Sequence, residues 1–134
     1  MKKVLASVLC FGLVGCATLS ESTAINRTNL LKLSVGMTKA EAISNMGTEA
    51  ATAYFQDIGG YHHAIAITNP YRSETLQGKD KIFEVVYYVT DDKANNGAIV
   101  DDDLTPLVFE NGKLIGWGYR FLQDNAQKYE IRIR

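Results

Sequence analysis

The residues of this chain best suited to binding a metal ion are two adjacent histidines, His62 and His63, and an acidic run over residues 91–103. Neighbouring residues of a strand point to opposite faces, so the two imidazoles cannot hold one ion in regular geometry. We therefore expect the two histidines to be ordinary strand residues.

The acidic run has part of the spacing of a calcium-binding loop. Asp92, Asn96, Gly97 and Asp103 fall at positions 1, 5, 6 and 12 of such a loop. Position 3 is Ala94, however, position 12 lacks the bidentate glutamate, and the flanking sequences are typical of strands. A solvated acidic loop is the better interpretation, and we expect neither a metal nor a cofactor.

Catalytic motifs are missing from the sequence. No serine stands in a Gly-x-Ser-x-Gly motif, and there is no phosphate-binding loop or dinucleotide fingerprint. The carboxylates of Glu84, Glu110 and Asp124 have no basic or nucleophilic neighbour in the sequence. We therefore predict that the protein is not an enzyme and has no catalytic residues.

Cys16 has the sequence context of an acylated cysteine. Lys2 and Lys3 precede an apolar stretch over residues 4–14, and Leu13-Val14-Gly15-Cys16 closes it. This order is typical of a secretion signal, and its end resembles the lipobox of bacterial lipoproteins. The resemblance implies that residues 1–15 are removed as a signal peptide and that Cys16 becomes the lipidated first residue. Two or more acyl chains would then anchor the protein stably on a membrane.

The alternative is that these residues form a transmembrane helix or a first buried helix. A span needs about 20 apolar residues, and this stretch reaches the polar Ser20 and Glu21 too early. Ala17 is not the aspartate that favours inner-membrane retention in enterobacteria, so we expect the outer membrane, facing the periplasm. Cys10 would leave with the signal, and no disulfide is then possible.

The charge balance argues against nucleic acid as a partner. The full chain has 14 Lys and Arg against 15 Asp and Glu, and removing Lys2 and Lys3 takes its net charge from −1 to −3. No basic run is present that could neutralise phosphates. The membrane, through Cys16, and an envelope protein are the partners that we expect.

Small polar residues and then a capping motif mark the start of the predicted domain. Residues 16–28 are interpreted as a flexible tether, and residues 29–134 as a single α+β domain. Thr38 and Glu41 form a capping box for a helix with Ala40, Ile43 and Met46 on its apolar face. A glycine at position 47 would end this helix.

Strands are predicted over residues 51–58, 61–68 and 82–90, although residues 48–55 could instead form a second helix. A final hairpin, 104–109 with 114–122, turns at Asn111-Gly112. Its expected register places Glu110 opposite Lys113, Val108 opposite Ile115 and Phe109 opposite Leu114.

That register sorts the hairpin into two apolar faces. The first carries Leu107, Phe109, Leu114, Gly116 and Gly118, whose glycines leave room for a helix; the second carries Val108, Ile115, Trp117, Tyr119 and Phe121. The second face is either covered by the chain's own loops or exposed for a partner. We therefore name Trp117, Tyr119 and Phe121 as possible partner-binding residues.

The stretch Val35-Gly36-Met37-Thr38-Lys39-Ala40-Glu41, the helix ending in Met46-Gly47 and the lipobox together resemble the SmpA/OmlA-like lipoproteins. One member of that family is an accessory subunit of the outer-membrane β-barrel assembly machine. Met46 replaces the usual leucine, and Glu49 the usual proline. The resemblance implies an α+β fold with one or two short N-terminal helices packed on an antiparallel sheet of three to five strands.

These observations favour a lipid-anchored, non-enzymatic module of the cell envelope that binds a protein partner or assists assembly. The alternative is a periplasmic lipoprotein that binds a small ligand or ion, or senses stress. It would use Tyr61, His62, Tyr87 and the acidic loop, and a pocket lined by these groups would favour it.

Overall fold

The computed structural model describes residues 17–92 and 98–132. The predicted signal peptide, Cys16 and residues 94, 96 and 97 of the acidic run lie outside the described residues. The elements, in chain order, are β1 (Ala17–Thr18), α1 (Leu19–Leu30), α2 (Lys39–Met46), β2 (Ala51–Gln56), β3 (His62–Ile67), β4 (Arg72–Gln77), β5 (Ile82–Val89), η1 (Asp101–Asp103), β6 (Leu104–Glu110), β7 (Lys113–Trp117) and α3 (Tyr119–Lys128).

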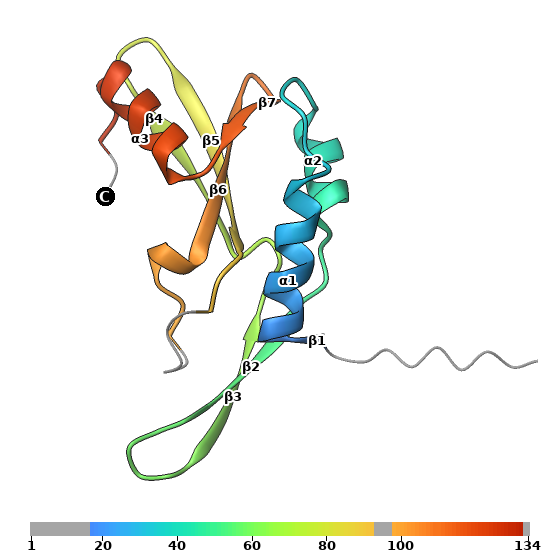
Figure 1. Ribbon diagram of the computed structural model, residues 1–134. Coiled ribbons are helices and arrows are strands. Elements are labelled where there is room, and N and C mark those ends of the chain that lie inside the picture. The colour runs from blue at the N-terminus through green and yellow to red at the C-terminus, as the bar shows by residue number, and fades with distance from the viewer. Residues whose placement is uncertain (1–16, 93–97, 133–134) are drawn as a thin grey trace, which may run out of the picture.

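A four-stranded antiparallel sheet in the order β4-β5-β6-β7 forms the centre of the domain, and helices lie on both of its sides (Figure 1). On one face, Leu107 belongs to the same buried cluster as Met46 of α2. On the other face, Val108 shares a buried cluster with Leu122 of α3. The predicted α+β class, with one or two short N-terminal helices on an antiparallel sheet, is confirmed. Helix α3 is an addition to it.

The predicted tether is wrong for its described part, because residues 19–30 form α1. The Thr18 side chain accepts a hydrogen bond from the Glu21 N–H, and the Glu21 carboxylate accepts one from the Thr18 N–H at 2.9 Å. The buried side chains of this helix are Ser22, Thr23, Asn26 and Asn29. Helix α1 has no apolar stripe, and hydrogen bonds attach it to the domain instead. One of them runs from Asn26 Nδ2 to the Val89 carbonyl at 2.8 Å. A hydrophobic pattern therefore cannot reveal this helix.

The second helix begins and ends where the sequence predicts. Thr38 and Glu41 form the expected capping box, and Gly47 ends the helix with a φ of 84°. The buried side chains are Ala42 and Met46, four residues apart, whereas Ala40 is exposed. The predicted apolar face is therefore rotated.

The β6–β7 turn is also confirmed, since Asn111 and Gly112 both have positive φ angles, 51° and 73°. Glu110 pairs with Lys113 and Phe109 with Leu114, as expected. Beyond these pairs a β-bulge shifts the register, and Val108 pairs with Gly116 rather than with Ile115.

The bulge exchanges the faces of the residues that follow it, because side chains alternate along a strand. Trp117 now packs on the α2 side of the sheet, with Leu107. Gly116 faces α3 instead. The strand also ends at residue 117, so Tyr119 and Phe121 belong to α3 rather than to a strand.

Two further differences concern the strands. Residues 51–56 form β2, not a helix, and the polar strand β4 has no counterpart in the prediction, since only Leu76 of its six residues is buried.

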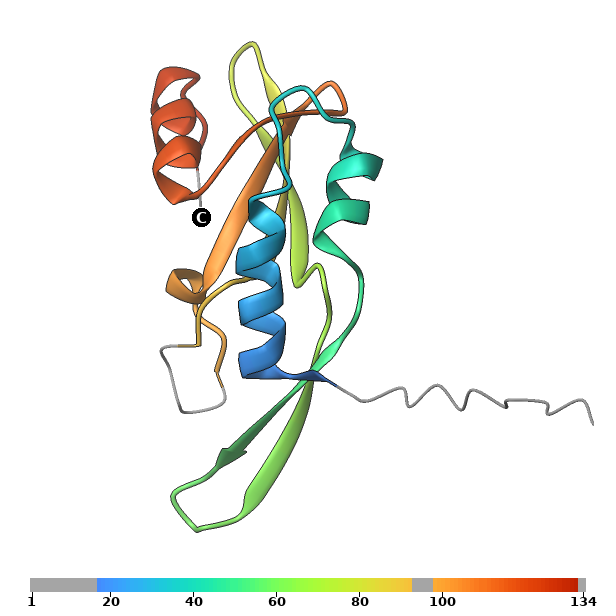
Figure 2. The ribbon, with the colours of Figure 1, turned by 45° about the vertical axis from the view of Figure 1, so that its right-hand side comes forward.

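We call residues 51–67, the antiparallel β2–β3 hairpin, the arm. It extends away from the four-stranded sheet and its helices in both views (Figures 1 and 2).

Candidate functional site

The arm combines a buried base with an exposed outer part. Ala51, Ala53 and Ile67 at its base belong to the core cluster on the α3 side. Toward the tip, Tyr54 is 71% exposed and Ile58 fully exposed. The other large exposed apolar side chains of the arm are Tyr61 and Ile65. Such a concentration of apolar groups outside the core is typical of an interaction surface.

The tip of the arm is held by a compact set of polar contacts. The Asp57 carboxylate accepts hydrogen bonds from the Gly59 N–H at 2.9 Å and the Tyr61 N–H at 3.0 Å. His63 Nε2 lies 2.8 Å from the same carboxylate, and the His63 ring stacks on Phe55 at 5.1 Å. The hydrogen bond from His63, followed by those from the backbone, lowers the pKa of Asp57. The tip is thus a defined turn that presents its apolar side chains.

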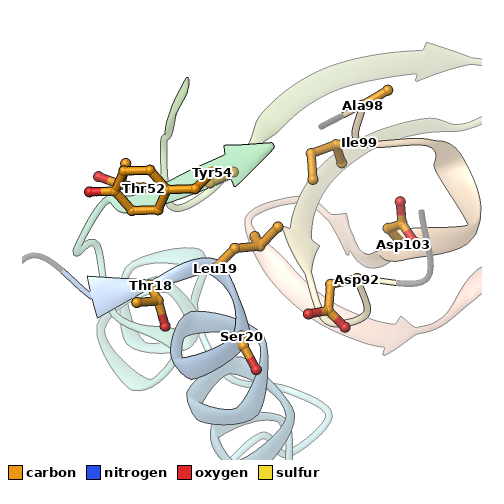
Figure 3. A pocket seen from close by; sticks show the side chains of 10 residues that line it. Thr18, Leu19, Ser20, Thr52, Tyr54, Asp92, Ala98, Ile99 and Asp103 are labelled. Atoms are coloured by element: carbon orange, nitrogen blue, oxygen red, sulfur yellow. The ribbon is translucent and has the colours of Figure 1, made fainter. Parts of the chain in front are cut away.

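A cavity of about 200 Å³ lies where the arm joins the domain (Figure 3). Leu19 at the start of α1 and Ile99 face each other across it, and Asp92 and Asp103 contribute carboxylates. Asp103 is buried, and its Oδ2 accepts a hydrogen bond from the Val100 N–H at 3.0 Å, at the start of η1. The described residues contain no group of three or more metal-ligating side chains.

A second polar cluster surrounds Tyr87, on the side of the sheet that faces α3. The Tyr87 hydroxyl donates to Glu74, and the Arg72 guanidinium lies 4.2 Å from the centre of the Tyr87 ring. Arg72 also donates to Asp101 at 2.9 Å. Burial, and then the hydrogen bond to Glu74, raises the pKa of Tyr87. This phenol therefore stays protonated near neutral pH, so that it serves as a donor tying β5 to β4 rather than as a base.

The residues of the ligand-binding alternative are not brought together. Tyr87 is buried in the core, whereas Tyr61 and His62 are exposed on the arm. The two histidines themselves are adjacent in β3, as predicted.

The predicted aromatic surface is also wrong as a single surface. Trp117 packs at the edge of the cluster that contains Met46 of α2. Tyr119 and Phe121 pack against the cluster on the opposite face of the sheet. All three rings are half-buried, and the β-bulge is the reason why they separate.

Two of the three carboxylates without basic neighbours in sequence acquire them through folding. Glu84 forms an ion pair with Lys39 at the start of α2, and Glu110 forms one with Lys81. The hydrogen bond to Glu110 raises the pKa of Lys81. Both pairs link elements at the surface, where such contacts contribute little to stability.

The sequence predicted both strands of the arm, but it did not predict that they project from the domain uncovered. The signal was the turn Asp57-Ile58-Gly59-Gly60 between two uncharged strand sequences. Nothing in the sequence shows that other elements leave these strands uncovered.

The fold and this site define a small α+β domain with a sheet covered on both faces and a projecting hairpin. Residues 17–124 match the model of DUF3192, a family described as proteins of unknown function, and the chain belongs to this family. No curated protein and no solved structure matches the chain. None of the helices in the described ranges is long and apolar enough to cross a membrane.

Proposed function

We propose that this protein is a lipid-anchored, non-enzymatic module of the bacterial envelope that holds a protein partner on its arm. The observation that carries the proposal is the arm itself, with Tyr54 exposed on β2 and with Ile58 and Tyr61 exposed on a turn that Asp57 holds in shape. Large exposed apolar groups on a defined scaffold are what protein interfaces use as anchors. We infer the outer membrane, facing the periplasm, as its location, as in the SmpA/OmlA-like lipoproteins.

The position of the N-terminal segment supports this proposal. Ala17 pairs with Ala51, and Thr18 with Thr52, at the base of the arm. Consecutive Cα atoms are about 3.8 Å apart, so a lipid on Cys16 would attach next to this base. An anchored protein would therefore present its arm close to the membrane surface, where envelope proteins are concentrated.

Crosslinking in intact envelopes, followed by purification of the full-length lipidated protein, tests the partner. We expect Tyr54→Ser and Ile58→Ser to reduce the recovery of one partner severalfold, because each removes an exposed apolar anchor. Leu31→Ser is the matched control, since Leu31 is 86% exposed but lies after α1. Equal recovery with all three variants would contradict partner binding by the arm.

Mass spectrometry of the purified protein tests the anchor separately. The N-terminal peptide should begin at Cys16 and carry the mass of its acyl chains, and Cys16→Ser should abolish both acylation and processing, so that residues 1–15 remain on the chain. A wild-type peptide that begins at Cys16 without lipid would rule out the anchored form.

A further inference from the structure

We propose that the partner adds an extended, uncharged segment of its own chain as a strand beside β3. This inference rests on the proposed function, because it names how the arm binds a partner. Pairing to an open strand edge is a recurrent mode of peptide recognition, in which the backbone provides affinity and alternate side chains provide specificity.

The outer edge of β3 has unpaired backbone groups. β3 pairs with β2 on one side, and no described strand pairs with its other side. The Asp57 N–H donates to the Tyr61 carbonyl at 3.0 Å, which makes these two residues a hydrogen-bonded pair. Because such pairs alternate along an antiparallel ladder, the N–H and C=O groups of His62, Ala64 and Ala66 point away from β2.

The two edges of the four-stranded sheet are protected, in contrast to this one. Segment 36–38 covers β7: the Leu114 N–H donates to the Met37 carbonyl and the Gly36 N–H to the Leu114 carbonyl, both at 2.8 Å. The opposite edge strand, β4, carries Arg72 and Glu74. Charged side chains and covering segments are the usual devices against unwanted strand pairing.

β3 has neither device. Its sequence, HHAIAI, contains no Lys, Arg, Asp, Glu, Pro or Gly, and all its residues except Ile67 are exposed. β2 offers a shorter edge, because β1 already pairs with Ala51 and Thr52. Six residues of β3 give an open edge about 20 Å long, which is enough for a short peptide segment.

The unpaired backbone groups and small side chains of the β3 edge indicate what kind of partner binds there. Lipid is a poor partner, because unpaired backbone groups cannot enter hydrocarbon without a large penalty. Ala64 and Ala66 lie on the same face as Tyr54, which is the cross-strand neighbour of Ala64. A partner strand with large apolar side chains at alternate positions would pack them over these two small residues.

A second copy of this chain fits less well. In a two-fold antiparallel pairing centred on Ile65, Ala64 would lie opposite Ala66 of the other copy, and no large side chain would cover either. A different chain with larger side chains is therefore the better occupant.

The experiment compares Ala64→Pro with Ala64→Ser in the full-length Cys16→Ser protein, which is free of lipid. Proline removes the outward N–H, and edge strands tolerate it, whereas serine retains that N–H at similar size. The probe is a capped peptide of alternating valine and threonine, with an N-methylated version as its control. We expect Ala64→Pro to weaken binding of the probe about tenfold, and Ala64→Ser to change it little.

Hydrogen exchange locates the bound probe. The amides of Ala64 and Ala66 should become protected when the peptide binds, and the N-methylated peptide should protect neither. Faster exchange of the His63 amide in the Ala64→Pro protein would show that the proline disturbs the arm. In that case the protection of Ala64 and Ala66 in the protein without the proline still tests whether the peptide binds as a strand.

Full binding by a folded Ala64→Pro protein, or protection of residues outside β3 only, would overturn strand addition. Self-association that Ala64→Pro abolishes would overturn a different chain as the occupant, in favour of a second copy. Arm-dependent binding to neutral phospholipid vesicles would also overturn strand addition, in favour of a lipid surface. If Tyr54→Ser blocks crosslinking in envelopes and Ala64→Pro does not, the proposed function stands and the strand mechanism fails.

Discussion

At the scale of single residues, Gly116 marks the closest approach between the sheet and α3. A Cβ atom at this position would lie 2.6 Å from two ring atoms of Phe121. The backbone there has no positive φ, so the requirement for glycine is one of space alone. The sequence led us to expect that the glycines make room for a helix, and the bulge determines that this helix is α3.

We predict that Gly116→Ala lowers the free energy of unfolding by about 1–3 kcal/mol, because the added methyl group overpacks this contact. Denaturant unfolding measures the loss. Combining the substitution with Phe121→Leu should recover part of it, since the smaller side chain vacates the space. No loss in the single variant would mean that Phe121 moves aside freely.

Tyr88 is a second residue with an unusual environment. Its side chain is fully buried, and its hydroxyl has no hydrogen-bond partner among the described residues. Burial raises the pKa of Tyr88 to about 12. The folded protein therefore holds this phenol neutral at a pH where the unfolded chain, with an ordinary pKa of about 10, loses the proton.

The sign of the pH effect follows from this difference. Below about pH 10 Tyr88 is neutral in both states, and above it the unfolded state is favoured by up to about 1.4 kcal/mol per pH unit until about pH 12. We predict that Tyr88→Phe reduces this alkaline loss of stability, measured by denaturant unfolding between pH 9 and pH 12. It should not destabilise the protein at neutral pH, because no hydrogen bond to a described residue is lost. An unchanged alkaline slope would contradict the prediction.

At the scale of elements, α1 is attached to the domain mainly by amide groups. Asn26 and Asn69 exchange hydrogen bonds at 3.2 Å in both directions, and Asn26 also donates to the Val89 carbonyl. Buried amides of this kind stabilise only when they are paired, and they are costly to disrupt. Helix α1 is therefore positioned by specific partners that are distant in sequence.

Asn26→Ala should consequently destabilise the protein by about 1–3 kcal/mol, because it leaves the Asn69 amide and the Val89 carbonyl without their partner. Ile25→Ala is the matched control on the same helix, since Ile25 is half exposed, and it should have a much smaller effect. Thermal or denaturant unfolding of both variants measures the difference. A larger loss for Ile25→Ala would show that apolar contacts hold this helix.

At the scale of the whole molecule, the arm differs from the rest of the domain in how it is stabilised. The four-stranded sheet is buried on both faces, whereas only the base of the arm reaches the core. A two-stranded hairpin without a covered face is only marginally stable. The arm therefore has the properties of a unit that opens separately from the rest of the domain.

Amide hydrogen exchange of the free protein should show this division. We predict that the inward amides of Phe55 and His63 exchange much faster than those of Val85 and Val108 in the central strands, because local opening of the arm costs less than global unfolding. Equal protection in both regions would mean that the arm opens only when the whole domain unfolds.

Local interactions determined what the sequence alone could predict. The capping box of α2, the Gly47 helix end and the Asn111-Gly112 turn depend on residues within a few positions of one another, and all were predicted correctly. The α+β class followed from the change in hydrophobic period along the chain.

Only the tertiary structure decided the rest, because it depends on partners distant in sequence. Helix α1 has a polar buried face that is explained by distant partners such as Asn69, the Val89 carbonyl and the Met46 carbonyl. The bulge in β7 places Trp117 on the side of the sheet that packs against α2, whereas Phe121 packs on the α3 side. Both helices are distant in sequence from at least one strand that they cover. Finally, the open edge of β3 is a property of what the remaining elements leave uncovered, and no local pattern encodes it.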